Sequence, residues 1–106
     1  MHNPVIYEQL NACAAACNAC YASCLNEDDV AMMARCIELN RDCAEVCLLA
    51  ASLVARDSEN ADNMLALCAN LCTACAEECE KHSQDHCKRC AQVCRACAEL
   101  CQSPAH

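Results

Sequence analysis

The stretch CAAACNACYASC, which runs from Cys13 to Cys24, carries four cysteines at intervals of four, three and four residues. Side chains three or four residues apart lie on the same face of an α-helix. A helix with this spacing therefore presents a row of thiols along one face. Thiols gathered in a row can bind metal ions, form disulfides or act as redox nucleophiles, and the rest of the chain has to discriminate between these chemistries.

The same spacing recurs along the chain, which has 106 residues, 16 cysteines and no glycine. Three later segments repeat it, with Asn40 in place of one cysteine in the second segment and the additional Cys87 ahead of the fourth. The cysteines are Cys13, Cys17, Cys20, Cys24, Cys36, Cys43, Cys47, Cys68, Cys72, Cys75, Cys79, Cys87, Cys90, Cys94, Cys97 and Cys101. The second half repeats the first at an offset of about 55 residues, so a duplicated helical hairpin is the simplest interpretation.

Four helices are expected to carry these rows, because the chain is rich in Ala, Leu, Glu, Arg and Gln, which favour helices. The expected ranges are 4–25, 27–55, 59–81 and 84–102. The expected cap residues are Asn3 with Pro4, Asn26, Ser58 and Ser83, and Ser103 with Pro104 closes the last helix. Short connections make neighbouring helices antiparallel. The sequence thus predicts an all-α fold, an antiparallel up-down four-helix bundle with a cysteine-lined core, as a single domain over residues 1–106.

Metal binding explains a sulfur-lined core better than packing or disulfides do. Cysteine fills less volume than leucine and oxidises easily, so a core of this composition gains nothing in packing. Cβ atoms of residues four apart on a helix are about 5–6 Å apart, whereas a disulfide needs about 3.8 Å. The chain also lacks glycine for a zinc knuckle and lacks the C-x2-C-x2-C-x3-C-P motif of iron–sulfur proteins.

Softness and charge favour Cu(I) among the metals. Soft thiolates select Cu(I), and two thiolates on one linearly coordinated ion span about 4.6 Å, which a pair of residues four apart can supply. Buried thiolates are costly unless they are neutralised. Tetrahedral Zn²⁺ in groups of four thiolates would leave a core charge of about −8, whereas one Cu⁺ for each thiolate would leave none. We therefore expect multiple Cu(I) ions per chain, with one proton released for each copper bound.

The repeated motif CxxxCxxCxxxC, the segment CIELNRDCAEVC and the absence of an export signal resemble the cytosolic four-helix-bundle copper storage proteins. The resemblance extends from Ile6 to Cys101. It implies storage of many Cu(I) ions inside the bundle, association as a homotetramer, and all sixteen cysteines as Cu(I) ligands. Asn40 stands where other rows carry a thiol, so we expect a polar contact in the core and a different copper coordination at that level.

One end of the expected bundle is rich in soft and polar side chains, and the other end is aliphatic. The candidate ligands for copper uptake at the first end are Met32, Met33, His82 and His86. Thioether and imidazole bind Cu(I) reversibly, so we expect copper to enter there and to pass inward to the cysteines. The alternative is that the methionines fill the core and the histidines lie solvated at a helix junction.

Charge and composition argue against several partners. The net charge is −8 and the seven basic residues are scattered, which disfavours nucleic acid. No apolar stretch reaches the roughly 18 residues that cross a membrane, so no membrane partner is expected. The N-terminus lacks the features of a secretory signal, so we expect a cytoplasmic protein with reduced thiols. His2 and His106 lie near the chain ends, where frayed residues are more common than metal ligands.

Storage of Cu(I) is the first functional hypothesis, and no catalysis is expected. Metallothionein-like buffering of zinc and copper is the closest alternative, and a copper chaperone or sensor is a second. A thiol redox enzyme is a third, which would depend on an exposed cysteine of low pKa. The segment from Cys87 to Cys90 is the candidate, but the row spacing alone also produces a CxxC at that point.

Overall fold

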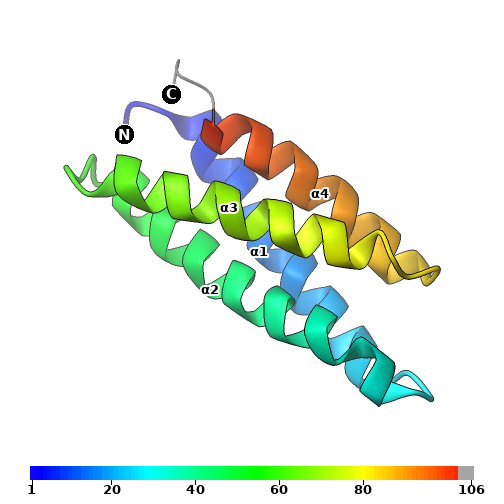
Figure 1. Ribbon diagram of the computed structural model, residues 1–106. Coiled ribbons are helices and arrows are strands. Elements are labelled where there is room, and N and C mark those ends of the chain that lie inside the picture. Colours follow the sequence, from blue (N-terminus) through cyan, green and yellow to red (C-terminus); the bar gives the residue numbers. More distant parts are fainter. Residues whose placement is uncertain (103–106) are drawn as a thin grey trace.

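The computed structural model describes residues 1–102. Four α-helices form an elongated bundle of about 43 × 19 × 18 Å (Figure 1). They are α1 (Pro4–Leu25), α2 (Ala34–Ala55), α3 (Ala61–Cys79) and α4 (Asp85–Gln102), and a short 3-10 helix, η1 (Val30–Met33), precedes α2. Residues 1–102 contain no strand, and the predicted all-α fold is confirmed.

Each helix packs against its neighbours in the chain, and α1 closes the ring by packing against α4. The helices alternate in direction, as the short connections predict (Figure 1). The chain therefore brings the C-terminal end of α1 and the start of α4 to the same end of the bundle, which we call the mouth. The mouth also holds η1, the end of α3 and the loops around them.

The predicted limits of α1 are confirmed, and its start is capped as expected. The Asn3 side chain accepts a hydrogen bond from the backbone N–H of Ile6 at 3.2 Å, and Pro4 occupies the first turn. Proline fits there because the first backbone N–H groups of a helix have no partner within it.

The predicted start of the second helix is wrong. Asn26 does not begin it but ends α1, where its backbone N–H donates to the carbonyl of Ser23 at 3.1 Å. Asp29 caps η1 instead, because its side chain accepts from the backbone N–H of Met32 at 3.4 Å. The side chain of Glu27 is bonded to His86 at 2.8 Å, which ties this part of the loop to α4.

The third helix is two residues shorter at each end than predicted, and the fourth begins one residue later than predicted but reaches Gln102 as predicted. The third helix begins at Ala61, because Ser58 forms a turn with the backbone N–H of Asn60 rather than capping the helix. It ends at Cys79. The fourth begins at Asp85, and Ser83 lies in the preceding loop. The predicted stop at Ser103 and Pro104 lies outside the described residues.

The core consists mostly of cysteine and alanine. At six places a buried cysteine is followed directly by a buried alanine, and these alanines are Ala14, Ala44, Ala69, Ala76, Ala91 and Ala98. Small side chains at these positions let the helices approach closely enough for sulfurs of different helices to meet. The end opposite the mouth is filled by Ile6, Leu10, Val54 and Leu65, as the sequence predicts.

Candidate metal centre

All sixteen cysteine side chains lie inside the bundle, and none is more than 3% exposed. All are free thiols. Sulfur atoms of different helices approach one another closely along the whole axis. The Sγ–Sγ distance is 3.2 Å between Cys47 and Cys68, and 3.5 Å between Cys36 and Cys79. The rows predicted from the spacing therefore face one another and form one continuous sulfur-lined interior.

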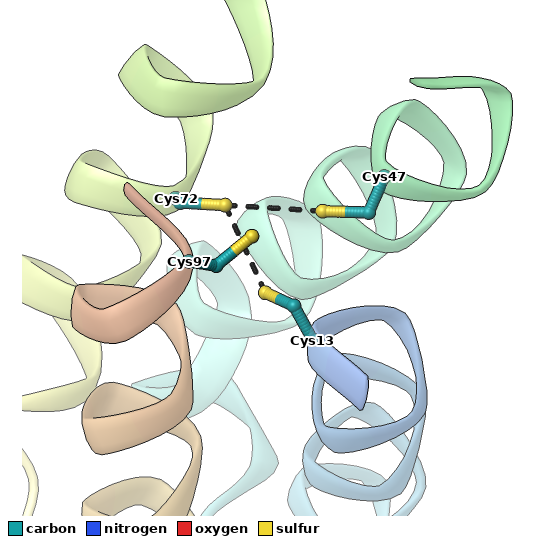
Figure 2. A group of neighbouring side chains, drawn as sticks. All are labelled: Cys13, Cys47, Cys72 and Cys97. Atoms are coloured by element: carbon teal, nitrogen blue, oxygen red, sulfur yellow. Dashed lines mark hydrogen bonds between the residues drawn. The ribbon is translucent and has the colours of Figure 1, made fainter. Parts of the chain in front are cut away.

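One group of four sulfurs contains a cysteine from each helix. Figure 2 shows Cys13, Cys47, Cys72 and Cys97 pointing toward one another from α1, α2, α3 and α4. Their sulfurs all lie within 4.8 Å of one another. Cys72 links two of the others, at 3.7 Å from Cys13 and 3.8 Å from Cys47. Such a group can surround one tetrahedral ion or share several ions of lower coordination number.

Successive groups along the axis share their cysteines. The next two groups are Cys13, Cys17, Cys43 and Cys94, and then Cys17, Cys75, Cys90 and Cys94. Because Cys13, Cys17 and Cys94 each belong to two groups, their sulfurs can bridge ions in neighbouring groups. Bridging of this kind is available to thiolate ligands and suits an interior that holds several ions rather than separate single-ion sites.

Asn40 lies completely buried at the level where the second row lacks a cysteine. Its Oδ1 atom accepts hydrogen bonds from the thiols of Cys75 at 3.1 Å and Cys90 at 3.4 Å. Its Nδ2 group donates to the sulfur of Cys36 at 3.6 Å. The amide therefore makes the polar contact expected in the core, and these three partners are all sulfurs.

The mouth contains one group with a nitrogen donor, namely Cys20, Cys24, His86 and Cys87, which we call the mouth tetrad. The Nδ1 atom of His86 is 3.3 Å from the sulfur of Cys20 and 3.6 Å from that of Cys87. On the other side of the ring, Nε2 donates to Oε1 of Glu27 at 2.8 Å. The sequence-predicted His86 thus joins the sulfur interior rather than lying solvated at a helix junction.

The other predicted mouth residues differ in position. Met33 is buried and sits beneath the mouth, where Gln84 Nε2 contacts its sulfur at 4.0 Å, whereas Met32 is 68% exposed. His82 is largely buried but turns its Nε2 atom to Glu78 at 3.0 Å. Met32, Met33 and His82 line one depression at the mouth together with the acidic loop after α1. Of the two histidines, His86 is the one that joins a group of thiols in the described part of the chain.

The pKa values of the mouth groups reflect their hydrogen bonds. Hydrogen bonds from neighbouring thiols, of which Cys36 contributes most, together with His86 lower the pKa of Cys20 to about 5. Burial alone would lower the pKa of His86, but hydrogen bonds to Cys20 and Glu27 outweigh it and raise the pKa. Burial is also the main reason why the pKa of Cys24 rises to about 11. The mouth therefore places one thiol of lowered pKa, Cys20, beside an imidazole of raised pKa and a thiol of raised pKa, Cys24.

The sequence does not single out the two glutamates that hold the histidines. Glu27 lies in an acidic run that fits the first turn of a helix equally well, and Glu78 lies four residues before His82 on α3. The Glu78 side chain is only 10% exposed, and it also lies 3.6 Å from Arg35 and 3.5 Å from Lys81. Spacing of four residues is the one signal that could have linked Glu78 to His82.

At the N-terminus, the His2 side chain lies outside the sulfur-lined interior. The backbone N–H of His2 donates a hydrogen bond to Oδ1 of Asp57 at 3.0 Å. Its side chain is exposed and lies at the end opposite the mouth. His106 lies outside the described residues. None of the helices, as far as the structure describes them, is long and apolar enough to span a membrane.

The fold and the site together define a cysteine-lined four-helix bundle of the kind that holds soft metal ions. The profile of the copper storage protein family matches residues 2–106, and the chain belongs to this family. The predicted family is thus confirmed, and the cysteine pattern in register with four helices is the feature that identifies it.

Three similar proteins illustrate the relationship. The Cu(I)-bound copper storage protein BsCsp3 superposes with a TM-score of 0.94, is 40% identical and is matched over 100% of both chains. A cytosolic copper storage protein from Streptomyces lividans, solved with five coppers, has a TM-score of 0.88 and is 38% identical, over 92% of this chain and 86% of that one. The uncharacterised cysteine-rich protein YhjQ of Bacillus subtilis strain 168 is 45% identical over 72% of this chain and 70% of that protein.

Proposed function

We propose that this protein stores Cu(I) by binding many ions to thiolates inside the bundle. The single observation that carries the proposal is the continuous interior of sixteen buried free thiols, whose groups share cysteines along the axis. A chaperone that hands over one ion needs one exposed site, and a redox enzyme needs an accessible thiolate. Membership of the copper storage family and the likeness to a Cu(I)-bound member support the same function.

We infer that all sixteen cysteines serve as Cu(I) ligands. Each of them is buried, and each faces the interior that the other rows face. Cu(I) neutralises one thiolate per ion, so a filled interior carries no net charge from its ligands, and the dry core accepts it. At the level of Asn40 one of the donors is an amide oxygen, so copper there meets a harder ligand than elsewhere in the core.

Copper enters at the mouth in this proposal, through Met32, Met33, His82 and His86. The exposed thioether of Met32 is the outermost soft donor, and Met33 and His82 lie deeper in the same depression. His86 contacts Cys20 directly and forms the last step before the all-sulfur interior. At the opposite end, the described core residues are aliphatic and supply no comparable set of soft donors.

Replacing Met32 and His86 with alanine tests this path. Copper uptake from a defined Cu(I) donor is expected to slow severalfold in stopped-flow measurements, while the final copper content stays within about two ions of the unaltered protein. The matched control replaces the exposed Val5, which lies in the first turn of α1 at the end opposite the mouth. An unchanged uptake rate in the first variant would show that copper enters elsewhere.

We propose further that the protein lies in the cytoplasm and forms a homotetramer. The Streptomyces relative is a cytosolic protein, and a reducing compartment keeps sixteen thiols free for metal. The exposed Leu48, Leu49 and Leu67 side chains on α2 and α3 give apolar surface that an oligomer would cover. Catalysis has no part in this function.

The storage function is tested by isolating the protein from cells grown with added copper. Copper is expected to co-purify in large excess over zinc, at many ions per chain, because soft thiolates select Cu(I). The control is a variant in which the four cysteines shown in Figure 2 are replaced by serine. This variant should carry substantially less copper. A protein isolated with mostly zinc would support the buffering alternative instead.

A further inference from the structure

The mouth tetrad differs from the inner groups in its donors. Two of its members, Cys20 and Cys24, come from α1, and the other two, His86 and Cys87, come from the first turn of α4. It offers three sulfurs and one imidazole nitrogen, whereas the inner groups of four offer sulfur alone. Three cysteines and one histidine are a common ligand set of tetrahedral Zn²⁺ in proteins.

The distances within the mouth tetrad fit a tetrahedral zinc ion. With Zn–S bonds of about 2.3 Å and a Zn–N bond of about 2.0–2.1 Å, sulfurs should lie about 3.8 Å apart and sulfur and nitrogen about 3.6 Å apart. The sulfur of Cys20 is 3.9 Å from that of Cys24 and 4.0 Å from that of Cys87. The Nδ1 atom of His86 is 3.3 Å from Cys20 and 3.6 Å from Cys87. These four distances therefore lie within about 0.3 Å of the zinc-binding values, and all the donor atoms of the tetrad lie within 4.8 Å of one another.

Glu27 supplies the outer contact that zinc-bound histidines usually have. Its carboxylate accepts a hydrogen bond from Nε2 of His86 at 2.8 Å, which fixes the ring and leaves Nδ1 to act as the ligand. A carboxylate in this place also makes the imidazole more electron-rich, which strengthens its bond to a metal. Glu27 is a positioning residue in this arrangement, because it contacts His86 and not the ion.

We propose that the mouth tetrad binds one Zn²⁺ per chain. Three thiolates and a neutral imidazole leave a charge of about −1 on the zinc site, whereas four thiolates would leave about −2 in a dry interior. The mouth tetrad also has the more favourable position for a hydrated divalent ion, since His86 and Glu27 retain partial exposure. The inner groups of four described above share cysteines with one another, whereas the mouth tetrad shares none with them and overlaps at Cys20 with the group of Cys20, Cys79 and Cys90. Among these groups of four, the mouth tetrad therefore overlaps least with another.

Zinc at the mouth closes the interior until copper arrives. It engages the three thiols of the mouth tetrad, and Cu(I), as the softer ion, displaces it from them by ligand exchange without any change of oxidation state. The zinc site uses three of the cysteines assigned above to copper storage, but it does not depend on whether the interior stores copper.

A zinc titration of the fully reduced, metal-free protein against a chromophoric zinc chelator tests the proposal. The expected result is one tightly bound zinc per chain, with X-ray absorption showing three sulfurs at about 2.3 Å and one nitrogen at about 2.0–2.1 Å. His86→Ala is expected to remove the nitrogen and the tight binding. His2→Ala, at an exposed histidine at the end opposite the mouth, should leave the zinc affinity unchanged.

The role of Glu27 is tested in the same titration. Glu27→Gln is expected to weaken zinc binding about 10- to 100-fold, as loss of an outer-shell carboxylate does elsewhere. Asp28→Asn removes the same charge at the next residue, which is exposed, and should leave the affinity unchanged. If the two variants weaken zinc binding equally, Glu27 acts only through its charge, and its positioning role is overturned.

Three results would overturn the zinc site: no tightly bound zinc, a shell of four sulfurs, or unchanged zinc binding in His86→Ala. Circular dichroism of each variant checks that the helices are retained. Copper capacity is measured on the same preparation and separates the two proposals. A high copper capacity without tight zinc contradicts the zinc site alone, and one tight zinc with a capacity of about one or two coppers contradicts storage alone.

Discussion

Asn40 shows how a single residue shapes a sulfur interior. In the described chain the buried polar side chains are Asn40 and Glu78, and only Asn40 lies on the core axis among thiols. A thiol is a weak donor, and a buried amide without partners would be costly. The short contacts from Cys75 and Cys90 therefore stabilise the amide and, in return, hold these thiols in place while the protein is free of metal.

Asn40→Ala is expected to lower the free energy of unfolding of the metal-free protein by about 2–3 kcal/mol. The loss comes from the cavity and from the unpaired thiols that the amide leaves behind. Urea unfolding under reducing conditions measures it, with Asn18→Ala, at an exposed position of α1, as the control. If the two variants are equally stable, the contacts of Asn40 with sulfur contribute nothing to the fold.

At the scale of the elements, ion pairs tie the helix ends around the mouth. Glu78 on α3 lies 3.6 Å from Arg35 on α2 and 3.0 Å from His82 in the next loop. Burial would raise the pKa of the Glu78 carboxyl, but the contacts with His82 and Lys81 outweigh it and lower the pKa. The charged carboxylate is therefore favoured in the folded protein, so these contacts stabilise the fold at neutral pH.

Glu78→Gln is expected to lower the free energy of unfolding by about 1 kcal/mol at neutral pH. A carboxyl with a depressed pKa stabilises the fold above its ordinary pKa of about 4.3, and the effect is lost as the pH falls through the lower, folded value. The difference between the unaltered protein and the variant should therefore close in acid. Thermal unfolding at several pH values measures it, with Glu77→Gln as the control. A difference that persists unchanged in strong acid would contradict this electrostatic origin.

The sequence predicted the helices better than their junctions. The cysteine rows determine which face of each helix is buried, and this holds wherever the period of the row continues, as from Cys13 to Cys24. The second helix begins seven residues later than predicted, at Ala34 rather than residue 27, because Glu27 binds a histidine on α4 and Asp29 caps η1. Contacts between segments far apart in the chain decide such boundaries, and the local spacing of residues does not predict these contacts.

The candidate site could be predicted in its ligand types but not in its grouping. Spacing places Cys13 and Cys17 on one row, yet only the packing of four helices shows that both share a group with Cys43 and Cys94. The different positions of His82 and His86 also depend on the loops at the mouth, which the spacing does not predict. The single-domain organisation and the assignment of individual ligands stay predictions.

At the scale of the whole molecule, an acidic chain encloses an interior that includes thiols of raised pKa. The net charge is −8 before copper is bound. Hydrogen bonds with Cys13 and other thiols, together with burial, raise the pKa of Cys17, and burial raises that of Cys24 to about 11. Such thiols are protonated at neutral pH, so each must lose a proton to become a thiolate ligand. Copper loading therefore releases protons and leaves the charge of the molecule nearly unchanged.

The apparent affinity for Cu(I) is expected to rise about tenfold per pH unit for each proton released. The sign follows from the protonated thiols, because higher pH removes the competing proton. Competition with a Cu(I) chelator of known pH dependence, repeated from mildly acidic to mildly alkaline solution, measures the slope. Affinity independent of pH would mean that the interior thiols are already ionised before copper binds.

An anaerobic Cu(I) titration of the fully reduced protein against a competing chelator tests the central claim most directly. If the sixteen buried thiolates are each neutralised by one ion, tightly bound copper should reach a plateau near the number of cysteines, about sixteen per chain. Zinc added in excess should not displace the copper, because thiolates prefer the softer ion. A plateau at about one or two coppers would contradict storage, because most of the thiols would then serve another purpose.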